Sequence, residues 1–515
     1  MLDVCMIFAA IGIETNFSVI DWCIVAVYLL GTAVIGLCVN RFVKNVGDYI
    51  VAGRAIKPYL GIATMIGTEL GLVTVMYAAQ KGFTGGFSAF HIALVAAIVT
   101  LAVGLSGFIV VPLRRMDVMT IPEFYEKRFG RGVRVFGGAI LVASGVLNMG
   151  LFLKAGSIFV TGITGMTSPL ALKLVLSGLL GLVLIYTVLG GMISVIVTDY
   201  VQFIVLSFGL IVSCIYAVQK LGWQTIIDTV TEQRGPAGFN PFHSDGFGVQ
   251  YVIWMAFLGL VSCAIWQTAV VRACSAENTK VVKRMYSFSS VGFMVRFLIP
   301  NFLGICALVY ICQTPALRSI FLPDDGNVDS GMTLMAMPVF VGQILPTGIL
   351  GIITAGMLAA FMSTHDSYLL CWSSVLTQDV IAPCFKNGLS NKARLRLTRT
   401  FVVLIGLFLL LWGLWYPLGQ DLWDYMAITG AVYSTGAFAL LVFGIYWKRA
   451  SSTGAYLALC SGGLAVLGLK PIAAQFNLHA SAETVGLATI GLAVVTMVLG
   501  SLVMPNKEPA TSEGN

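Results

Sequence analysis

Charged residues are scarce in this chain. Only 10% of its 515 residues are Asp, Glu, Lys or Arg, whereas 58% are hydrophobic. Soluble domains are about one quarter charged, so a water-excluded core cannot hold this many apolar side chains and lipid must solvate the rest. The low charge content excludes an ordinary soluble domain and predicts one integral, all-α polytopic membrane domain.

Motifs for common enzyme chemistry and for metal binding are also missing. The chain has four histidines, no HExxH, no GxSxG and no glycine-rich phosphate loop. Its 11 cysteines form no CxxC pair, and Cys214, Cys263 and Cys371 lie in apolar runs, where they serve as small packing residues. We therefore expect no enzyme and no cofactor. Isolated acids such as Asp199 and Asp366 leave an intramembrane protease as a remote alternative.

The net charge of +7 does not indicate nucleic-acid binding, because Lys and Arg cluster in short loops between apolar runs. With the N-terminus outside, 22 of the 30 Lys and Arg fall in cytoplasmic segments and 6 outside. Cytoplasmic loops carry the excess of basic residues in membrane proteins. The expected topology is N-terminus outside and C-terminus cytoplasmic, in a plasma membrane or a bacterial inner membrane.

Thirteen mostly apolar stretches are long enough to span a bilayer as helices. They are 17–40, 58–82, 86–113, 133–165, 169–190, 193–219, 249–271, 286–312, 347–380, 399–416, 422–447, 453–470 and 483–504. Loops are short except 220–248 and 313–346.

Two spans, 58–82 and 249–271, have polar or glycine-rich centres. Such interrupted helices at matching positions of two half-repeats are the best sequence indication of a transporter site. We expect an N-terminal segment with one extra helix (1–57), two repeats of five spans and opposite topology (58–219 and 249–447), two C-terminal helices (453–504) and a disordered cytoplasmic tail (505–515). The glycines could instead only permit close helix packing.

Charged residues at membrane depth mark functional candidates, because each costs several kcal/mol to insert. They are Glu69, Lys154, Asp199, Arg296 and the His365-Asp366 pair. Glu69 lies at the centre of the first interrupted span and is the strongest candidate for binding a cation or a solute. Lys154 is a possible salt-bridge partner for an acid, and Arg296 a possible partner for a neighbouring helix. Asp199 follows the Gly190-Gly191 pair, where we expect a turn, and so lies about two turns into the span 193–219. It is either a functional acid or a polar group just inside the cytoplasmic interface.

A hydroxyl-rich stretch in the span 347–380 could bind a small hard cation. The Ser363 and Thr364 hydroxyls could combine with backbone carbonyls of an interrupted helix into a cage of neutral oxygens, which binds sodium weakly enough to release it. Alternatively, such hydroxyls bond back to their own helix.

Several stretches resemble the solute:sodium symporter family, which includes sodium–proline, sodium–galactose, sialic acid and choline symporters. The most specific is Tyr186-Thr-Val-Leu-Gly-Gly-Met-Ile-Ser-Val-Ile-Val-Thr-Asp199-Tyr-Val-Gln202. Supporting stretches are Gly53-Arg54, Trp266-Gln267 with Arg272, and Ala360-Phe-Met-Ser363-Thr364 leading to Thr377-Gln-Asp379. The resemblance spans about residues 20–450 in order.

The resemblance implies the inverted five-plus-five fold of the leucine transporter with flanking helices. It also implies a sodium site between the first and eighth core helices. By position, the backbone carbonyls come from Gly67, Leu70 and Ala360, and the hydroxyls from Ser363 and Thr364. Asp199 matches an acid on the sodium exit path or at a second sodium site.

The resemblance leaves the solute open. Trp266 and Gln267 match a choline-transporter stretch in which an aromatic ring faces a cation, whereas Glu69 matches an acid of the proline symporter. Asn148 falls near the position of a further aromatic residue. Glu69 with Trp266 suits an amine or a zwitterion, and Lys154 keeps an organic anion such as a monocarboxylate possible.

We therefore predict a sodium-coupled symporter that imports a small organic solute by alternating access. Its partners are the solute, sodium ions and the lipid bilayer, and sodium is the coupling ion. The alternatives are a proton-coupled or uncoupled transporter or channel of the same fold, and a transporter-like sensor. The sequence does not predict the oligomeric state.

Overall fold

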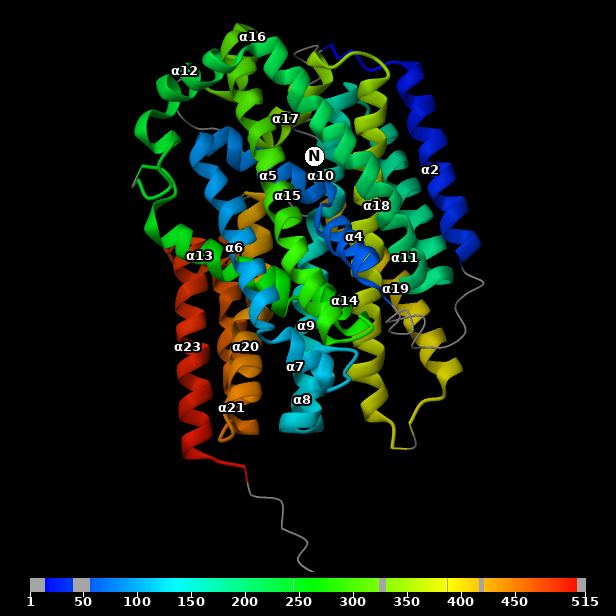
Figure 1. The fold of residues 1–515 in the computed structure, drawn as a ribbon, viewed down its shortest axis with the longest axis vertical. Coiled ribbons are helices and arrows are strands. Elements are labelled where there is room, and N and C mark those ends of the chain that lie inside the picture. Colours follow the sequence, from blue (N-terminus) through cyan, green and yellow to red (C-terminus); the bar gives the residue numbers. More distant parts are fainter. Residues whose placement is uncertain are drawn as a thin grey trace, which may run out of the picture.

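In the computed structural model, α-helices pack side by side, and most of them run roughly along the long axis of the molecule (Figure 1). The structure describes residues 14–39, 56–243, 245–323, 330–386, 388–415 and 421–506. Ten helices in this part of the chain are long and apolar enough to cross a membrane, and three shorter apolar helices accompany them. Helices suit this environment because each satisfies its own backbone hydrogen bonds in lipid. The chain is a multi-pass membrane protein.

The principal helices, in chain order, are α2 (Val19–Val39), α4 (Pro58–Glu69), α5 (Leu72–Gly85), α6 (Phe90–Ser106), α7 (Val110–Arg115), α8 (Ile121–Phe129), α9 (Arg131–Asn148), α10 (Phe152–Thr164), α11 (Pro169–Leu221), α12 (Trp223–Arg234), α13 (Gly248–Leu260), α14 (Gln267–Ser275), α15 (Thr279–Gln313), α16 (Pro315–Phe321), α17 (Ser330–Ile344), α18 (Ile349–Val375), α19 (Asn391–Trp415), α20 (Leu422–Tyr446), α21 (Ser452–Gly463), α22 (Lys470–Gln475) and α23 (Ala482–Val503).

Both helices with polar centres are interrupted, as predicted. The first stops at Glu69 and restarts at Leu72, with Leu70 and Gly71 outside the helical conformation between α4 and α5. The second passes through a π-helical turn, Val261–Ile265, to Trp266, whose backbone is extended before α14 begins. The breaks are confirmed; the relation of the two halves as inverted repeats stays a prediction.

The structure corrects the turn expected at the Gly-Gly pair, because α11 is one helical segment there. It contains two apolar spans, Pro169–Leu189 and Val195–Leu221. A straight helix of 53 residues would be about 80 Å long, more than twice the bilayer core. Tyr186 and Asp199 nevertheless both bond to the same turn of α18. Both spans of α11 are therefore held against one turn of α18.

The long loop expected at 313–346 contains two helices that hydropathy did not predict, α16 and α17. With 15 residues, α17 is too short to register as a span. It packs tightly against α10, because a methyl group on Gly342 would lie 2.9 Å from the Ile163 carbonyl oxygen. The loop expected at 220–248 likewise contains α12.

Helices from loops predicted to lie on opposite sides of the membrane lie at opposite ends of the molecule. In Figure 1, α12 and α16, from the loops predicted to be outside, lie at one end, and α8, from a loop predicted to be cytoplasmic, lies at the other. Which end faces the cytoplasm stays a prediction. Gly53-Arg54 lies outside the described residues, as do the first residues of the predicted N-terminal segment and most of the predicted tail.

Candidate functional site

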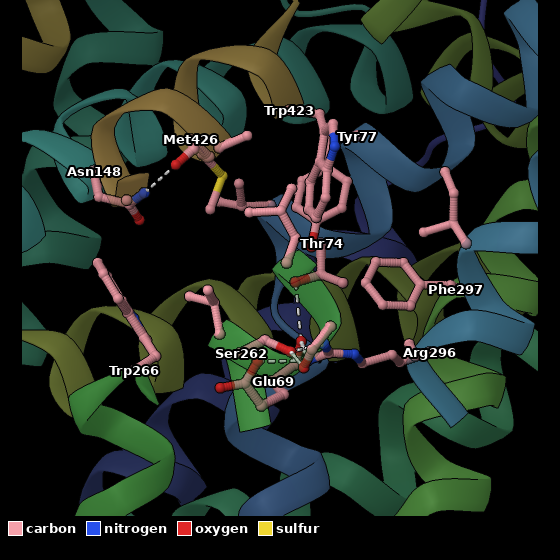
Figure 2. Close-up of a pocket in the computed structure, with 18 of the residues that line it drawn as sticks. Glu69, Thr74, Tyr77, Asn148, Ser262, Trp266, Arg296, Phe297, Trp423 and Met426 are labelled. Carbon is pink, nitrogen blue, oxygen red and sulfur yellow. Dashed lines mark hydrogen bonds and ion pairs between the residues drawn. The ribbon is translucent and has the colours of Figure 1, made fainter. Parts of the chain in front are cut away.

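A cavity of about 110 Å³ lies beside both helix breaks, among α5, α13, α15 and α20. Cavities for drug-sized ligands are about 300–1,000 Å³, so this one suits a small solute. Tyr77 and Trp423 stand at one end of it, and Glu69 and Arg296 at the other (Figure 2). The Tyr77 and Trp423 ring centroids are 4.4 Å apart, and the Phe297 centroid is 6.1 Å from each.

Glu69 lies in the cavity wall, and it forms an ion pair with Arg296. Arg296 Nη1 lies 2.5 Å from Glu69 Oε2, and Nη2 donates to Ser262 Oγ at 3.3 Å. The guanidinium also lies 4.0 Å from the centroid of the Phe293 ring. Glu69 is the last residue of α4 and Arg296 lies in mid α15, so the ion pair fixes the break in α4 against α15.

Among the other solute-binding candidates, Trp266 and Asn148 line the cavity. Trp266 Nε1 donates to Tyr368 Oη at 3.1 Å. Asn148 ends α9 at a short 3₁₀ segment, and its Nδ2 donates to the Met426 carbonyl at 2.8 Å. Asn148 Oδ1 is buried and accepts no hydrogen bond from any described residue.

Gln267 and Lys154 lie elsewhere. Gln267 is fully buried beneath Trp266, and its Oε1 accepts from the Ile121 backbone N–H at 2.9 Å, which ties α14 to α8. Lys154 is buried in α10 and is not among the residues that line the cavity. Trp266 has an extended backbone just before Gln267 begins α14, and successive side chains of extended backbone point to opposite sides, so Gln267 does not follow Trp266 into the cavity.

The proposed sodium ligands gather where the break in α4 faces α18. A methyl group on Gly71 would lie 2.1 Å from Thr364 Oγ1, and one on Gly67 would lie 3.0 Å from the Asp199 carbonyl oxygen. Thr364 Oγ1 donates to the Ala360 carbonyl at 2.9 Å, the back-bond typical of membrane helices. This bond uses the hydroxyl proton and leaves oxygen lone pairs available. Leu70 follows Glu69 in the same break.

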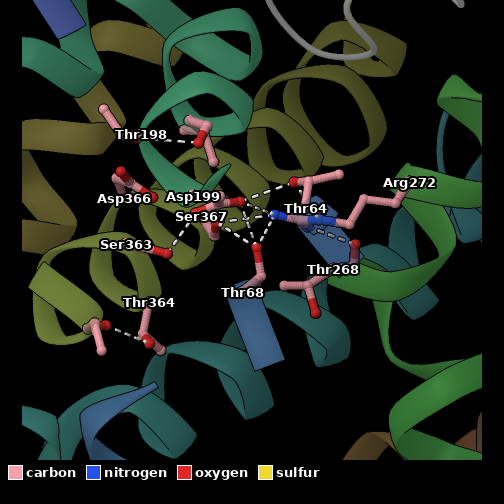
Figure 3. Close-up of polar contacts among 12 residues, drawn as sticks. Thr64, Thr68, Thr198, Asp199, Thr268, Arg272, Ser363, Thr364, Asp366 and Ser367 are labelled. Carbon is pink, nitrogen blue, oxygen red and sulfur yellow. Dashed lines mark hydrogen bonds and ion pairs between the residues drawn. The ribbon is translucent and has the colours of Figure 1, made fainter. Parts of the chain in front are cut away.

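Asp199 lies next to these groups at the centre of a buried polar network (Figure 3). Its Oδ1 accepts from Ser363 Oγ at 2.5 Å, and its Oδ2 accepts from Thr64 and Thr68 at 2.8 Å each. Arg272 Nη2 lies 3.3 Å from the same Oδ2. Asp199 is fully buried, and its depth in the membrane stays a prediction.

A second ion-pair cluster lies one turn beyond Tyr77 on α5. Lys81 Nζ is 3.1 Å from Asp421 and 3.5 Å from Asp424, at the start of α20. Burial alone raises the pKa of the Asp421 carboxyl, but the Lys81 charge and hydrogen bond outweigh it, so this pKa lies below its ordinary value. Gln80 binds Thr333 on α17 at 2.7 Å. The C-terminal half of α5 is thereby held to α17 and α20.

Comparison with known proteins places this architecture in a family. The model of the sodium:solute symporter family matches residues 49–462. The chain belongs to the sodium:solute symporter family. Its proteins are transporters, so this symporter is not an enzyme.

Among relatives of this symporter, sodium/glucose cotransporter 4 of Danio rerio is 26% identical, over 86% of this chain and 70% of that protein. A sodium/proline symporter of Staphylococcus aureus is 24% identical, over 90% and 88%. The solved structure of a Na⁺-coupled sialic acid symporter in a substrate-bound, outward-open state superposes with a TM-score of 0.81, at 21% identity, over 96% of this chain and all of that one. A structure of MhsT with L-phenylalanine gives 0.53 at 15% identity, over 87% and 98%.

Proposed function

We propose that this protein is a sodium-coupled secondary active symporter that imports a small organic solute by alternating access. The observation that carries the proposal is the break after α4, where Gly71 faces the Thr364 hydroxyl of α18 and which borders the cavity. Irregular backbone at membrane depth is tolerated where it lines a cavity or binds something. The relatives named for sodium symport support the same reading.

Coupling requires that sodium and solute affect each other's binding. Glu69 and Thr364 both line the cavity, while Thr364 is also one of the proposed sodium ligands. The sodium site would therefore share a wall with the solute site. Sodium bound there would hold the α4 break against α18 and shape the wall on which the solute binds.

The deciding experiment is uptake into proteoliposomes of purified protein, with an inward sodium gradient and the membrane potential clamped. The solutes are labelled amino acids, betaines, amines, sugars and monocarboxylates. We expect uptake of at least one solute to fall to the level of empty liposomes when potassium replaces sodium. Equal uptake in potassium would contradict the sodium coupling. Uptake driven by a proton gradient without sodium would favour the proton-coupled alternative.

A further inference from the structure

The Glu69–Arg296 pair limits which solutes the cavity can accept. Only 3% of the Arg296 side chain and 13% of the Glu69 side chain are exposed. A cationic solute would add a second positive charge beside the proposed sodium to a buried site in which Glu69 and Arg296 already balance, and unpaired buried charge is strongly disfavoured. An anionic solute would bring its charge next to the Glu69 carboxylate without a group to neutralise it there. A solute with one positive and one negative group could instead engage both residues and keep the site neutral.

Polar atoms that the protein leaves without partners point to the same chemistry. Arg296 Nε donates to no described residue and Asn148 Oδ1 accepts from none, although both atoms are buried and both residues line the cavity. The first needs an acceptor and the second a donor. Thr74 and Thr364, by contrast, already donate to carbonyl groups. The cavity thus offers a few polar atoms of complementary kind, fewer than the ring of hydroxyls on a sugar would require.

We infer that the solute of this symporter is a small zwitterion, with its carboxylate on Arg296 and its cationic group on Glu69. Arginine binds carboxylates through two parallel N–H donors, a geometry that Lys cannot offer. The Asn148 amide oxygen would accept from the cationic group if it carries N–H, and the Trp266 face would attract it if it is methylated. This inference rests on the proposed function and deepens it.

The first test compares four small ions and zwitterions of similar size and one larger sugar in sodium buffer, by sodium-dependent uptake and by thermal stabilisation of the purified protein. L-Alanine and glycine betaine are zwitterions, choline lacks the carboxylate, lactate lacks the cation, and D-galactose is uncharged. We expect one zwitterion to bind at least tenfold more tightly than choline, lactate and galactose. Alanine and betaine separate an ammonium from a quaternary cation.

The outcomes separate the two proposals. Sodium-dependent uptake of choline, lactate or galactose as strong as that of either zwitterion would contradict the assignment of a zwitterionic solute. It would leave the sodium coupling intact. Binding of none of the five would also overturn it. Zwitterion uptake that is unchanged in potassium would uphold the solute class and contradict the coupling.

The second test removes the charges in a balanced way. Arg296→Gln leaves Glu69 buried without its partner and should lower expression, so the informative variant is Glu69→Gln/Arg296→Gln, which keeps the site neutral. We expect the double variant to express and to bind the zwitterion at least tenfold more weakly. Arg318→Gln, the same change on the exposed face of α16, is the control and should bind normally. Parental affinity in the double variant would refute the assignment.

Discussion

The two hydroxyls proposed as sodium ligands are each held in place by a neighbour. Ser363 donates its proton to Asp199, and Thr364 donates to Ala360, so both hydroxyl oxygens are oriented before any ion arrives. Gly71 is equally constrained, since any side chain there would occupy the position of Thr364 Oγ1. Because the hydroxyls are already oriented, the entropic cost of ordering them when an ion binds is smaller.

Removing either hydroxyl should weaken sodium activation. Ser363→Ala and Thr364→Ala each delete one oxygen from the proposed cage, and an unreplaced ligand costs about 1–3 kcal/mol. We expect the half-activating sodium concentration to rise roughly tenfold or more, because about 1.4 kcal/mol is tenfold in affinity. The measurement is initial uptake against sodium concentration at matched expression. Parental sodium curves in both variants would remove these residues from the site.

Neighbouring elements meet most closely where two glycines oppose two carbonyls. A methyl group on Gly82 of α5 would lie 1.9 Å from the Asn301 carbonyl oxygen, and one on Gly304 of α15 would lie 1.9 Å from that of Ala79. Helices in lipid gain stability from close backbone approach at small residues. This contact sets the distance between α5 and α15, which carry Tyr77 and Arg296 on opposite sides of the cavity.

Separating these helices should destabilise the protein. Gly304→Ala places a methyl group against backbone, which cannot move aside as a side chain can, and overpacking of this kind costs about 1–3 kcal/mol. We expect a lower midpoint of thermal unfolding in detergent. Gly178→Ala is the control, because a methyl group there meets nothing within 4 Å. An unchanged midpoint for Gly304→Ala would contradict the tight contact.

Hydropathy and polar interruptions predict the long apolar helices and both helix breaks, since these depend on residues close in sequence, but they miss the shorter α16 and α17. The pairing of Glu69 with Arg296 could not be predicted, because the residues are 227 positions apart and meet only through the packing of α4 on α15. The sequence shows both charges at membrane depth, and the need to neutralise buried charge indicates that each has a partner. The sequence alone predicts that Arg296 pairs with a neighbouring helix, but not that it lies in the cavity wall.

At the scale of the whole molecule, the net charge carried with each solute determines how strongly the membrane potential drives its accumulation. The cavity wall is neutral because Glu69 and Arg296 pair, and a zwitterion is neutral too. If one sodium is coupled to each solute, as we propose, that sodium is the only net charge that moves with the solute. A symporter of this kind moves net positive charge inward, whereas one sodium with an organic anion would move none.

Accumulation should therefore respond to voltage. One charge crossing 100 mV gains about 2.3 kcal/mol, which at about 1.4 kcal/mol per decade corresponds to a roughly fifty-fold ratio of inside to outside solute. The test uses proteoliposomes with equal sodium on both sides and a potassium diffusion potential of about −100 mV set by valinomycin. We expect the bound zwitterion to accumulate at −100 mV and to equilibrate at 0 mV. Accumulation that ignores the potential would show that no net charge crosses with the solute, and would favour an organic anion over a zwitterion as the cargo.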